Sequence, residues 1–253
     1  MAQDLWQSLN GDEHVHSLSA RPFRIVESQH LVATRKLVDT DEEQRILEEL
    51  IDAQKPARKD DAARPLHYLL YTPFRYPPLR HGSRFGTRLE PGIWYGALER
   101  RTAFAETAYY RLLFVEGSAA ALTPLDLELT VFRVRMKTAR GVDLTAPPFA
   151  AHESTLSSKS HYDASQALGR AMRAARVEAF MYRSARDIEG GTNVGLFSAL
   201  AFTERKPSGV ETWWCRVERE RVEFAKKSHF ERDSTAFSRE EFLVGGRLPS
   251  PAV

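Results

Sequence analysis

The stretch RYPPLRHGSRFGTRLEPGIWYGALERRTAFAE, residues 75–106, predicts a loop, a strand and a helix in succession. Its first half is rich in Pro and Gly turns, which a stable helix would not tolerate. Residues 92–98 (GIWYGAL) are apolar and flanked by Gly and Pro, which predicts a strand. Thr102 can cap a helix over 102–114, where apolar residues recur at helical spacing. We therefore expect a strand–turn–helix unit here.

Outward from this unit, strands and isolated helices follow one another without a regular βαβ cadence. This order favours a mixed α+β fold over a doubly wound sheet. The tail at 238–253 is ambiguous. The remaining expected elements are strands at 66–73, 125–137, 177–184 and 193–202, a helix at 163–176, a surface loop at 138–162 and a hairpin at 212–227.

The first 65 residues read as an extension. Within it, residues 40–54 (TDEEQRILEELIDAQ) have a cap candidate and an apolar stripe, which predicts an amphipathic helix. The charged, Pro-bounded segment that follows reads as a linker. We expect a core over 66–205, with a hairpin and tail at 206–253 that complete it. The extension helix fits partner docking, self-association or plain packing on the core equally well.

Composition is that of an ordinary globular protein of 253 residues with a formal net charge of +2. Nothing in that charge suggests wholesale wrapping of nucleic acid. Cys215 is the single cysteine, which excludes an internal disulfide and a cysteine-based metal cluster. No apolar run approaches the roughly 20 residues needed to span a bilayer, and no secretion signal is recognisable. We expect a cytoplasmic protein without membrane contact.

Three residues carry the chemistry of the opening stretch: Arg84, Tyr95 eleven residues later, and Glu106 eleven further. An arginine can hold phosphate, a tyrosine can stack on a flat ring, and a carboxylate can stabilise a cation. Together they suit a nucleotide with a positively charged leaving base, which points toward NAD⁺. The plain alternative is an acidic residue that stabilises the first helical turn, beside one surface arginine of many.

Two further pairs of residues extend this candidate site. Arg75 and Tyr76 offer a second phosphate fork and another ring. Ser184 and Asn193 lie across a Gly–Gly turn, and both can hydrogen-bond a carboxamide or a ribose hydroxyl. Ordinary turn chemistry explains the second pair equally well. The N-terminal histidines lack further spaced ligands, so we expect no metal site.

The segments GSRFG and WYGALERRTAFAE, followed downstream by YRSARDIEGGTNVGLF, resemble the RES domain family over residues 66–203. The family is named after Arg, Glu and Ser, which fall here at Arg84, Glu106 and Ser184. Where the family pattern has Trp-Asn-Pro after the arginine, this chain has Phe-Gly-Thr-Arg. Several spaced motifs in the right order make the resemblance specific.

The resemblance implies a core like that of the ADP-ribosyltransferases. It also implies a bacterial toxin that degrades NAD⁺ by phosphorolysis or hydrolysis and is neutralised by a Xre-type helix-turn-helix antitoxin. NAD⁺ would be a substrate, inorganic phosphate a possible co-substrate, and no cofactor would be needed. A homodimer is possible.

Residue roles follow from the same resemblance. Glu106 would be the catalytic carboxylate, and Arg84 with Arg75 would hold the pyrophosphate. Tyr95, with Tyr76 behind it, would stack on the nicotinamide or its ribose. On the nicotinamide side, the substrate would be positioned by Ser184 and Asn193.

Two rival functions remain open. One is an ADP-ribosyltransferase that moves the same group onto a macromolecule. The other is a non-catalytic interaction module whose arginine-rich face binds a partner.

Overall fold

The computed structural model describes residues 5–28, 66–76, 78, 82–118, 124–228 and 232–250, together with 40, 42, 43, 46, 47 and 50. The amphipathic helix predicted over 40–54 therefore lies largely outside the described residues, as does the predicted linker.

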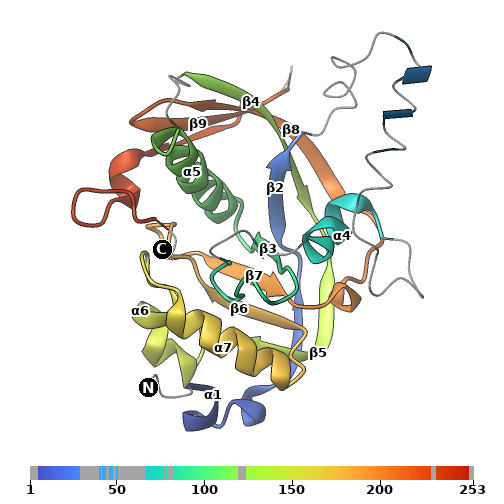
Figure 1. Ribbon diagram of the computed structural model, residues 1–253, viewed down its shortest axis with the longest axis vertical. Helices are drawn as coiled ribbons and strands as arrows, with labels where there is room; N and C mark the ends of the chain where they lie inside the picture. Colours follow the sequence, from blue (N-terminus) through green and yellow to red (C-terminus); the bar gives the residue numbers. More distant parts are fainter. Residues whose placement is uncertain are drawn as a thin grey trace.

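The fold is built on one ten-stranded sheet with the order β1-β5-β6-β7-β3-β2-β4-β8-β9-β10 (Figure 1). Neighbours are antiparallel except β5 and β6, which are parallel. This confirms the mixed α+β class. The strands are β1 (His16–Ala20), β2 (Phe23–Glu27), β3 (Trp94–Ala97), β4 (Leu125–Arg133), β5 (Met136–Asp143), β6 (Ala179–Arg183), β7 (Thr192–Leu196), β8 (Ser208–Val217), β9 (Arg221–Lys226) and β10 (Ser234–Ser238).

Three longer helices pack against this sheet, and each buries its apolar side in a separate cluster. They are α4 (Tyr68–Arg75), α5 (Arg100–Glu116) and α7 (Asp163–Ala174). Helix α5 packs on β4, β8 and β9, whereas α7 packs near β6 (Figure 1). The short elements are α1 (Leu5–Ser8), η1 (Gly11–His14), η2 (Phe149–His152), α6 (Glu153–Leu156), η3 (Ala199–Ala201) and η4 (Arg239–Phe242).

Two sequence expectations about secondary structure are wrong, and the strand expected at 193–202 ends at Leu196, because Ala199–Ala201 form η3. Residues 66–73, expected as a strand, lie mostly in α4, where Leu70 and Tyr71 are buried and the His67 ring accepts a hydrogen bond from the backbone N–H of Leu69. A short apolar run fits a buried helix and a strand equally well. Residues 138–162, expected as a surface loop, contain most of β5, then η2 and α6. Their Pro and Ser content hid the buried apolar positions of these elements.

Part of the expected N-terminal extension belongs to the sheet. Strand β1 pairs with β5, and β2 lies between β3 and β4. At the other end of the chain, β8 and β9 form the predicted hairpin. The sheet therefore combines strands from all three of the expected segments.

The sheet divides between β2 and β3. Strand β2 pairs with β4 over five residues, from Phe23 to Glu27, but with β3 only at Phe23 opposite Ala97. Beyond this bridge the two strands no longer pair. The candidate site lies in that division.

Candidate functional site

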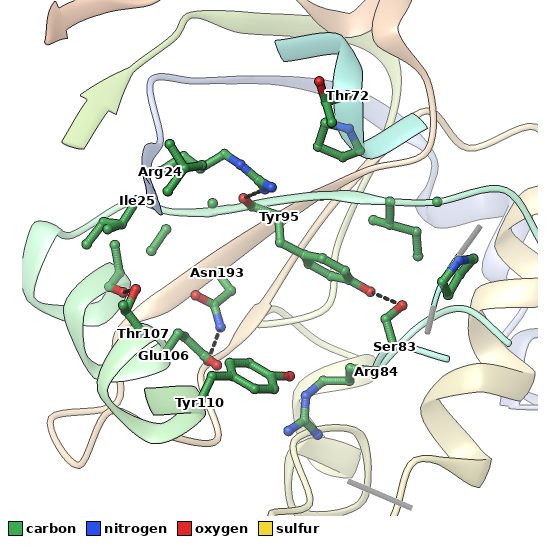
Figure 2. Close-up of a pocket in the computed structure, with 18 of the residues that line it drawn as sticks. Arg24, Ile25, Thr72, Ser83, Arg84, Tyr95, Glu106, Thr107, Tyr110 and Asn193 are labelled. Atoms are coloured by element: carbon green, nitrogen blue, oxygen red, sulfur yellow. Dashed lines mark hydrogen bonds between the residues drawn. The ribbon is translucent and has the colours of Figure 1, made fainter. Parts of the chain in front are cut away.

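A cavity of about 650 Å³ opens between β2 and β3 and is closed by α4, α5 and the loop before β3 (Figure 2). This volume suits a nucleotide-sized ligand. Most of its wall is apolar or aromatic. Among the described lining residues only Arg24, Arg84 and Glu106 are charged. A ligand here would therefore meet two cations and one carboxylate.

Glu106 lies in the second turn of α5, not in the first turn as the sequence suggested. The helix begins at Arg100, two residues before the expected cap Thr102, and Glu99 occupies the N-cap without a side-chain capping bond. The stabilising effect of the helix dipole is concentrated in the first turn. Helix stability is therefore a weaker explanation for this carboxylate than the sequence indicated.

One oxygen of Glu106 is held by two donors. Ser184 Oγ donates to Oε1 at 2.7 Å, and Asn193 Nδ2 donates to the same oxygen at 2.6 Å. Ser184 follows β6 and Asn193 belongs to the neighbouring β7, so the sheet fixes both donors. Within the described part of the chain, no group donates a hydrogen bond to Oε2. The carboxylate is thus oriented through one oxygen, and the other remains available to a ligand.

The Ser184 hydroxyl uses all its hydrogen-bonding capacity inside the protein. Its oxygen accepts from the backbone N–H groups of Arg186 and Asp187, both at 3.1 Å, while its proton goes to Glu106. A hydroxyl has one donor and two acceptor positions, and these contacts fill them. Ser184 is therefore arranged to orient the carboxylate.

Tyr95 holds the loop that carries Arg84. Its hydroxyl lies 3.0 Å from Ser83 Oγ and accepts a hydrogen bond from the backbone N–H of Phe85 at 3.2 Å. Burial raises the pKa of Tyr95 to about 12, so the phenol is neutral at physiological pH. The ring lines the cavity while its hydroxyl anchors the loop (Figure 2).

The Arg84 guanidinium is largely committed to the protein. Nη1 donates to the carbonyl of Ser158 at 2.7 Å and to that of Leu156 at 3.3 Å. The group also lies over the Tyr162 ring, 4.6 Å from its centroid. Arg84 is 7% exposed. It therefore joins the cavity wall to the segment after α6 and places a positive charge beside the site.

Arg24 is a site residue that the sequence did not reveal. It projects from β2 into the cavity, and its Nη1 donates to the backbone carbonyl of Tyr95 (Figure 2). Its Nε is buried without a partner in the described structure. Burial lowers the pKa of Arg24 to about 10, so the group stays charged at neutral pH. The only sequence signal was an arginine within the otherwise apolar segment FRIV at 23–26.

Of the other predicted residues, one lines the cavity and one does not. Tyr76, at the end of α4, lines the cavity and is partly exposed, whereas its neighbour Arg75 is not among the lining residues. Tyr110, which the sequence analysis did not single out, lines the cavity one helical turn beyond Glu106 and is half exposed. Its position four residues after a candidate carboxylate in a predicted helix was the available signal.

The sequence analysis predicts neither a metal site nor membrane contact. Across the described ranges, no three His, Cys, Asp or Glu side chains are grouped so as to hold a metal ion. None of the described helices has the length and apolar character required to cross a membrane.

Comparison with known proteins identifies the family. A family model described as RES domain matches residues 55–218, which is more than half of the chain. No curated protein matches. A solved structure described as the M. tuberculosis MbcT-MbcA toxin-antitoxin complex contains a chain of similar fold, with 13% identity and a TM-score of 0.47 over 86% of this chain and 93% of that one. The family match covers Arg84, Glu106 and Ser184, and on that match the chain belongs to the RES domain family.

Proposed function

We propose that this protein degrades NAD⁺ by cleaving the bond between nicotinamide and ribose. The observation that carries the proposal is the Glu106 carboxylate, held at one oxygen by Ser184 and Asn193 in a cavity that also contains two guanidinium groups. Membership of the RES domain family supports the same activity.

The chemistry requires a fixed negative charge. As the bond from C1′ to the nicotinamide nitrogen breaks, its electron pair leaves with the ring, and neutral nicotinamide departs. The ribose then develops oxocarbenium character, which an oriented carboxylate stabilises. An oxygen of water, which gives up a proton to solvent, or of inorganic phosphate then forms a bond to C1′ and completes the reaction. Glu106 Oε2 is the oxygen available to the ribose.

Arginine side chains bind the pyrophosphate in this proposal. Arg84 donates to two backbone carbonyls, so it contributes mainly charge and shape. Arg24 lines the cavity and has no carboxylate paired with it in the described structure, so we assign it the main phosphate contact. Binding energy spent on the pyrophosphate then orients the distant reacting bond.

Aromatic residues complete the proposed site. The rings of Tyr76 and Tyr110 line the cavity and are partly exposed, so either can stack on a substrate ring. Asn193 donates one amide N–H to Glu106. Arg75 lies outside the cavity lining, which leaves it no direct role in this proposal.

The test measures nicotinamide release from NAD⁺ by the purified protein, with and without phosphate. Wild-type protein should release nicotinamide, and Glu106→Gln should lose at least about 100-fold in kcat because a neutral amide cannot stabilise the developing cation. Glu223→Gln, which changes an exposed glutamate on β9, is the matched control and should retain activity. Product identity distinguishes phosphorolysis from hydrolysis. Wild-type activity in Glu106→Gln would remove the proposed mechanism.

The same assay separates two further alternatives. With NAD⁺ labelled in the adenylate half, label on a macromolecule would favour an ADP-ribosyltransferase. Neither turnover nor a rise in melting temperature with NAD⁺ would favour a non-catalytic module, because a ligand of the native state raises that temperature. We also propose that a Xre-type antitoxin neutralises the enzyme; co-expression followed by co-purification and loss of NAD⁺ turnover tests it.

A further inference from the structure

The turn at 184–187, which follows β6, is attached to the start of α5 through Asp187. The Asp187 carboxylate is buried, and the residue is 6% exposed. Arg101 Nη1 donates to its Oδ1, and Thr102 Oγ1 donates to its Oδ2 at 2.7 Å. Both donors lie in the first turn of α5. The attachment point is therefore one helical turn before Glu106 on the same helix.

The same turn fixes the direction of the Ser184 proton. Backbone N–H groups of Arg186 and Asp187 point at Ser184 Oγ from inside the turn. With its acceptor positions filled, the hydroxyl has one remaining bond to make, and it donates to Glu106. A change in the shape of the turn would redirect this proton.

We infer that Asp187 is a positioning residue for the reaction, because it clamps the 184–187 turn onto α5 and so keeps the Ser184 hydroxyl aimed at Glu106. The inference rests on the proposed function for its kinetic consequence and on the contacts above for its structural one. Asp187 does not line the cavity, so it acts through Ser184 and not on the substrate.

Close packing around the clamp supports this assignment. A Cβ atom on Gly191 would lie 1.9 Å from Thr102 Oγ1 and 2.8 Å from Asp187 Oδ2. Only glycine at position 191 leaves room for the backbone that follows the 184–187 turn to approach α5 this closely. Thr102 is fully buried, and its hydroxyl lies closer to Asp187 Oδ2, at 2.7 Å, than to its second acceptor Glu99 Oε2, at 3.3 Å.

The clamp requires a side chain with two acceptor oxygens at position 187. Both carboxylate oxygens accept from donors on α5. Asparagine has nearly the same shape, but its amide nitrogen would face a donor in place of an acceptor. A buried donor left without an acceptor is destabilising. Relaxation of the turn is the expected response.

A double-mutant cycle tests the inference. Asp187→Asn should lower kcat for nicotinamide release about tenfold or more, with little change in KM, because the substrate contacts stay in place. Ser184→Ala should lower kcat by a similar factor. Adding Asp187→Asn to Ser184→Ala should then lower kcat little further, since the hydroxyl that the clamp directs is already gone.

Controls separate positioning from loss of structure. Glu189→Gln changes an exposed glutamate that also pairs with Arg101, and it should retain wild-type kcat. Thr102→Val removes only the clamping hydroxyl and should lower kcat, whereas Thr102→Ser should preserve it. Melting temperatures identify any variant that fails to fold. Additive losses in the cycle, or wild-type kcat in both Asp187→Asn and Thr102→Val, would overturn the inference.

A crystal structure of Asp187→Asn gives a readout that does not need turnover. The clamp predicts that Ser184 Oγ moves out of hydrogen-bonding distance of Glu106 Oε1. If the wild-type enzyme leaves NAD⁺ intact, the proposed function fails and this structure alone decides the inference. An unchanged contact between Ser184 and Glu106 would then refute it.

Discussion

Arg24 donates a hydrogen bond to the backbone carbonyl of Tyr95 across the division between β2 and β3. In a continuous sheet that carbonyl could accept from a neighbouring strand; here a side chain takes the place of the strand. The consequence is a positive charge held inside the cavity by a backbone carbonyl of β3. Arg24 lies outside residues 55–218, so the family match alone would not include it in the site.

Replacement of Arg24 should weaken substrate binding. Arg24→Ala removes the main proposed contact to the pyrophosphate and should raise KM for NAD⁺ about 10- to 100-fold, since a charged hydrogen bond contributes roughly 1.5–3 kcal/mol. Arg24→Lys keeps the charge without the planar fork, so its KM should fall between those of wild type and Arg24→Ala. Initial rates across a range of NAD⁺ concentrations measure both.

Arg219→Ala is the control for this prediction, because Arg219 is an exposed arginine on the turn after β8. It should leave KM unchanged. An unchanged KM in Arg24→Ala as well would show that the phosphate contact lies elsewhere.

Tyr95 should make stability depend on pH above pH 10. Burial raises its pKa from 10.0 to about 12, so folding favours the protonated phenol. This contribution to stability is complete below pH 10 and is lost as the pH rises toward 12. Tyr95→Phe loses hydrogen bonds worth about 1 kcal/mol but cannot ionise. The stability advantage of wild type over Tyr95→Phe should therefore shrink between pH 10 and 12.

Urea unfolding of both proteins at pH 8, 10 and 11.5 measures this difference. Ionisation of a buried tyrosine that does not interact with Tyr95, such as Tyr109, affects both proteins equally and cancels. A difference that stays constant over the whole pH range would contradict the assignment.

Sequence periodicity was sufficient where an element has a clear apolar face. The strand at 92–98 and the helix at 163–176 are present as β3 and α7, within a few residues of the predicted ends. Residues 66–73 were misassigned because an apolar run of eight residues carries no distinguishing period. Tertiary packing against Trp94 and Phe202 decides this case in favour of the helix α4.

The two halves of the site differ in how far sequence could predict them. Glu106, Ser184 and Asn193 were selected for their chemistry. Their mutual hydrogen bonds, however, depend on the register between β6 and β7 and on where α5 packs against these strands. Arg24 depends on a remote pairing of β2 with β4, which no local pattern encodes. Residue type thus indicated the carboxylate side, while the arginine on β2 required the fold.

Gly92 should control the width of the cavity. A Cβ atom at this position would lie 1.9 Å from the carbonyl oxygen of Pro73 and 2.7 Å from that of Tyr76, both at the end of α4. Gly92→Ala must therefore displace the end of a helix that forms one cavity wall. We expect a lower melting temperature and a KM for NAD⁺ raised several-fold.

Gly117→Ala serves as the comparison for Gly92→Ala. Gly117 ends α5 with right-handed helical geometry, and an added Cβ would approach the Leu113 carbonyl only to 3.2 Å. Its KM should match wild type. Equal kinetics in the two alanine variants would show that α4 does not shape the substrate site.

Tyr110 should contribute through its ring more than through its hydroxyl. It follows Glu106 by one helical turn, lines the cavity and is half exposed, so its face can meet a substrate ring close to the carboxylate. Tyr110→Phe keeps the face and should retain KM within about threefold, whereas Tyr110→Ala should raise it about tenfold. Phe114→Ala, one further turn along α5 and equally exposed but outside the cavity lining, should leave KM unchanged. Equal KM values in Tyr110→Ala and Phe114→Ala would exclude stacking at this position, and the exposed rings of Tyr68 and Tyr76 on the cavity wall would then be the candidates for binding the substrate.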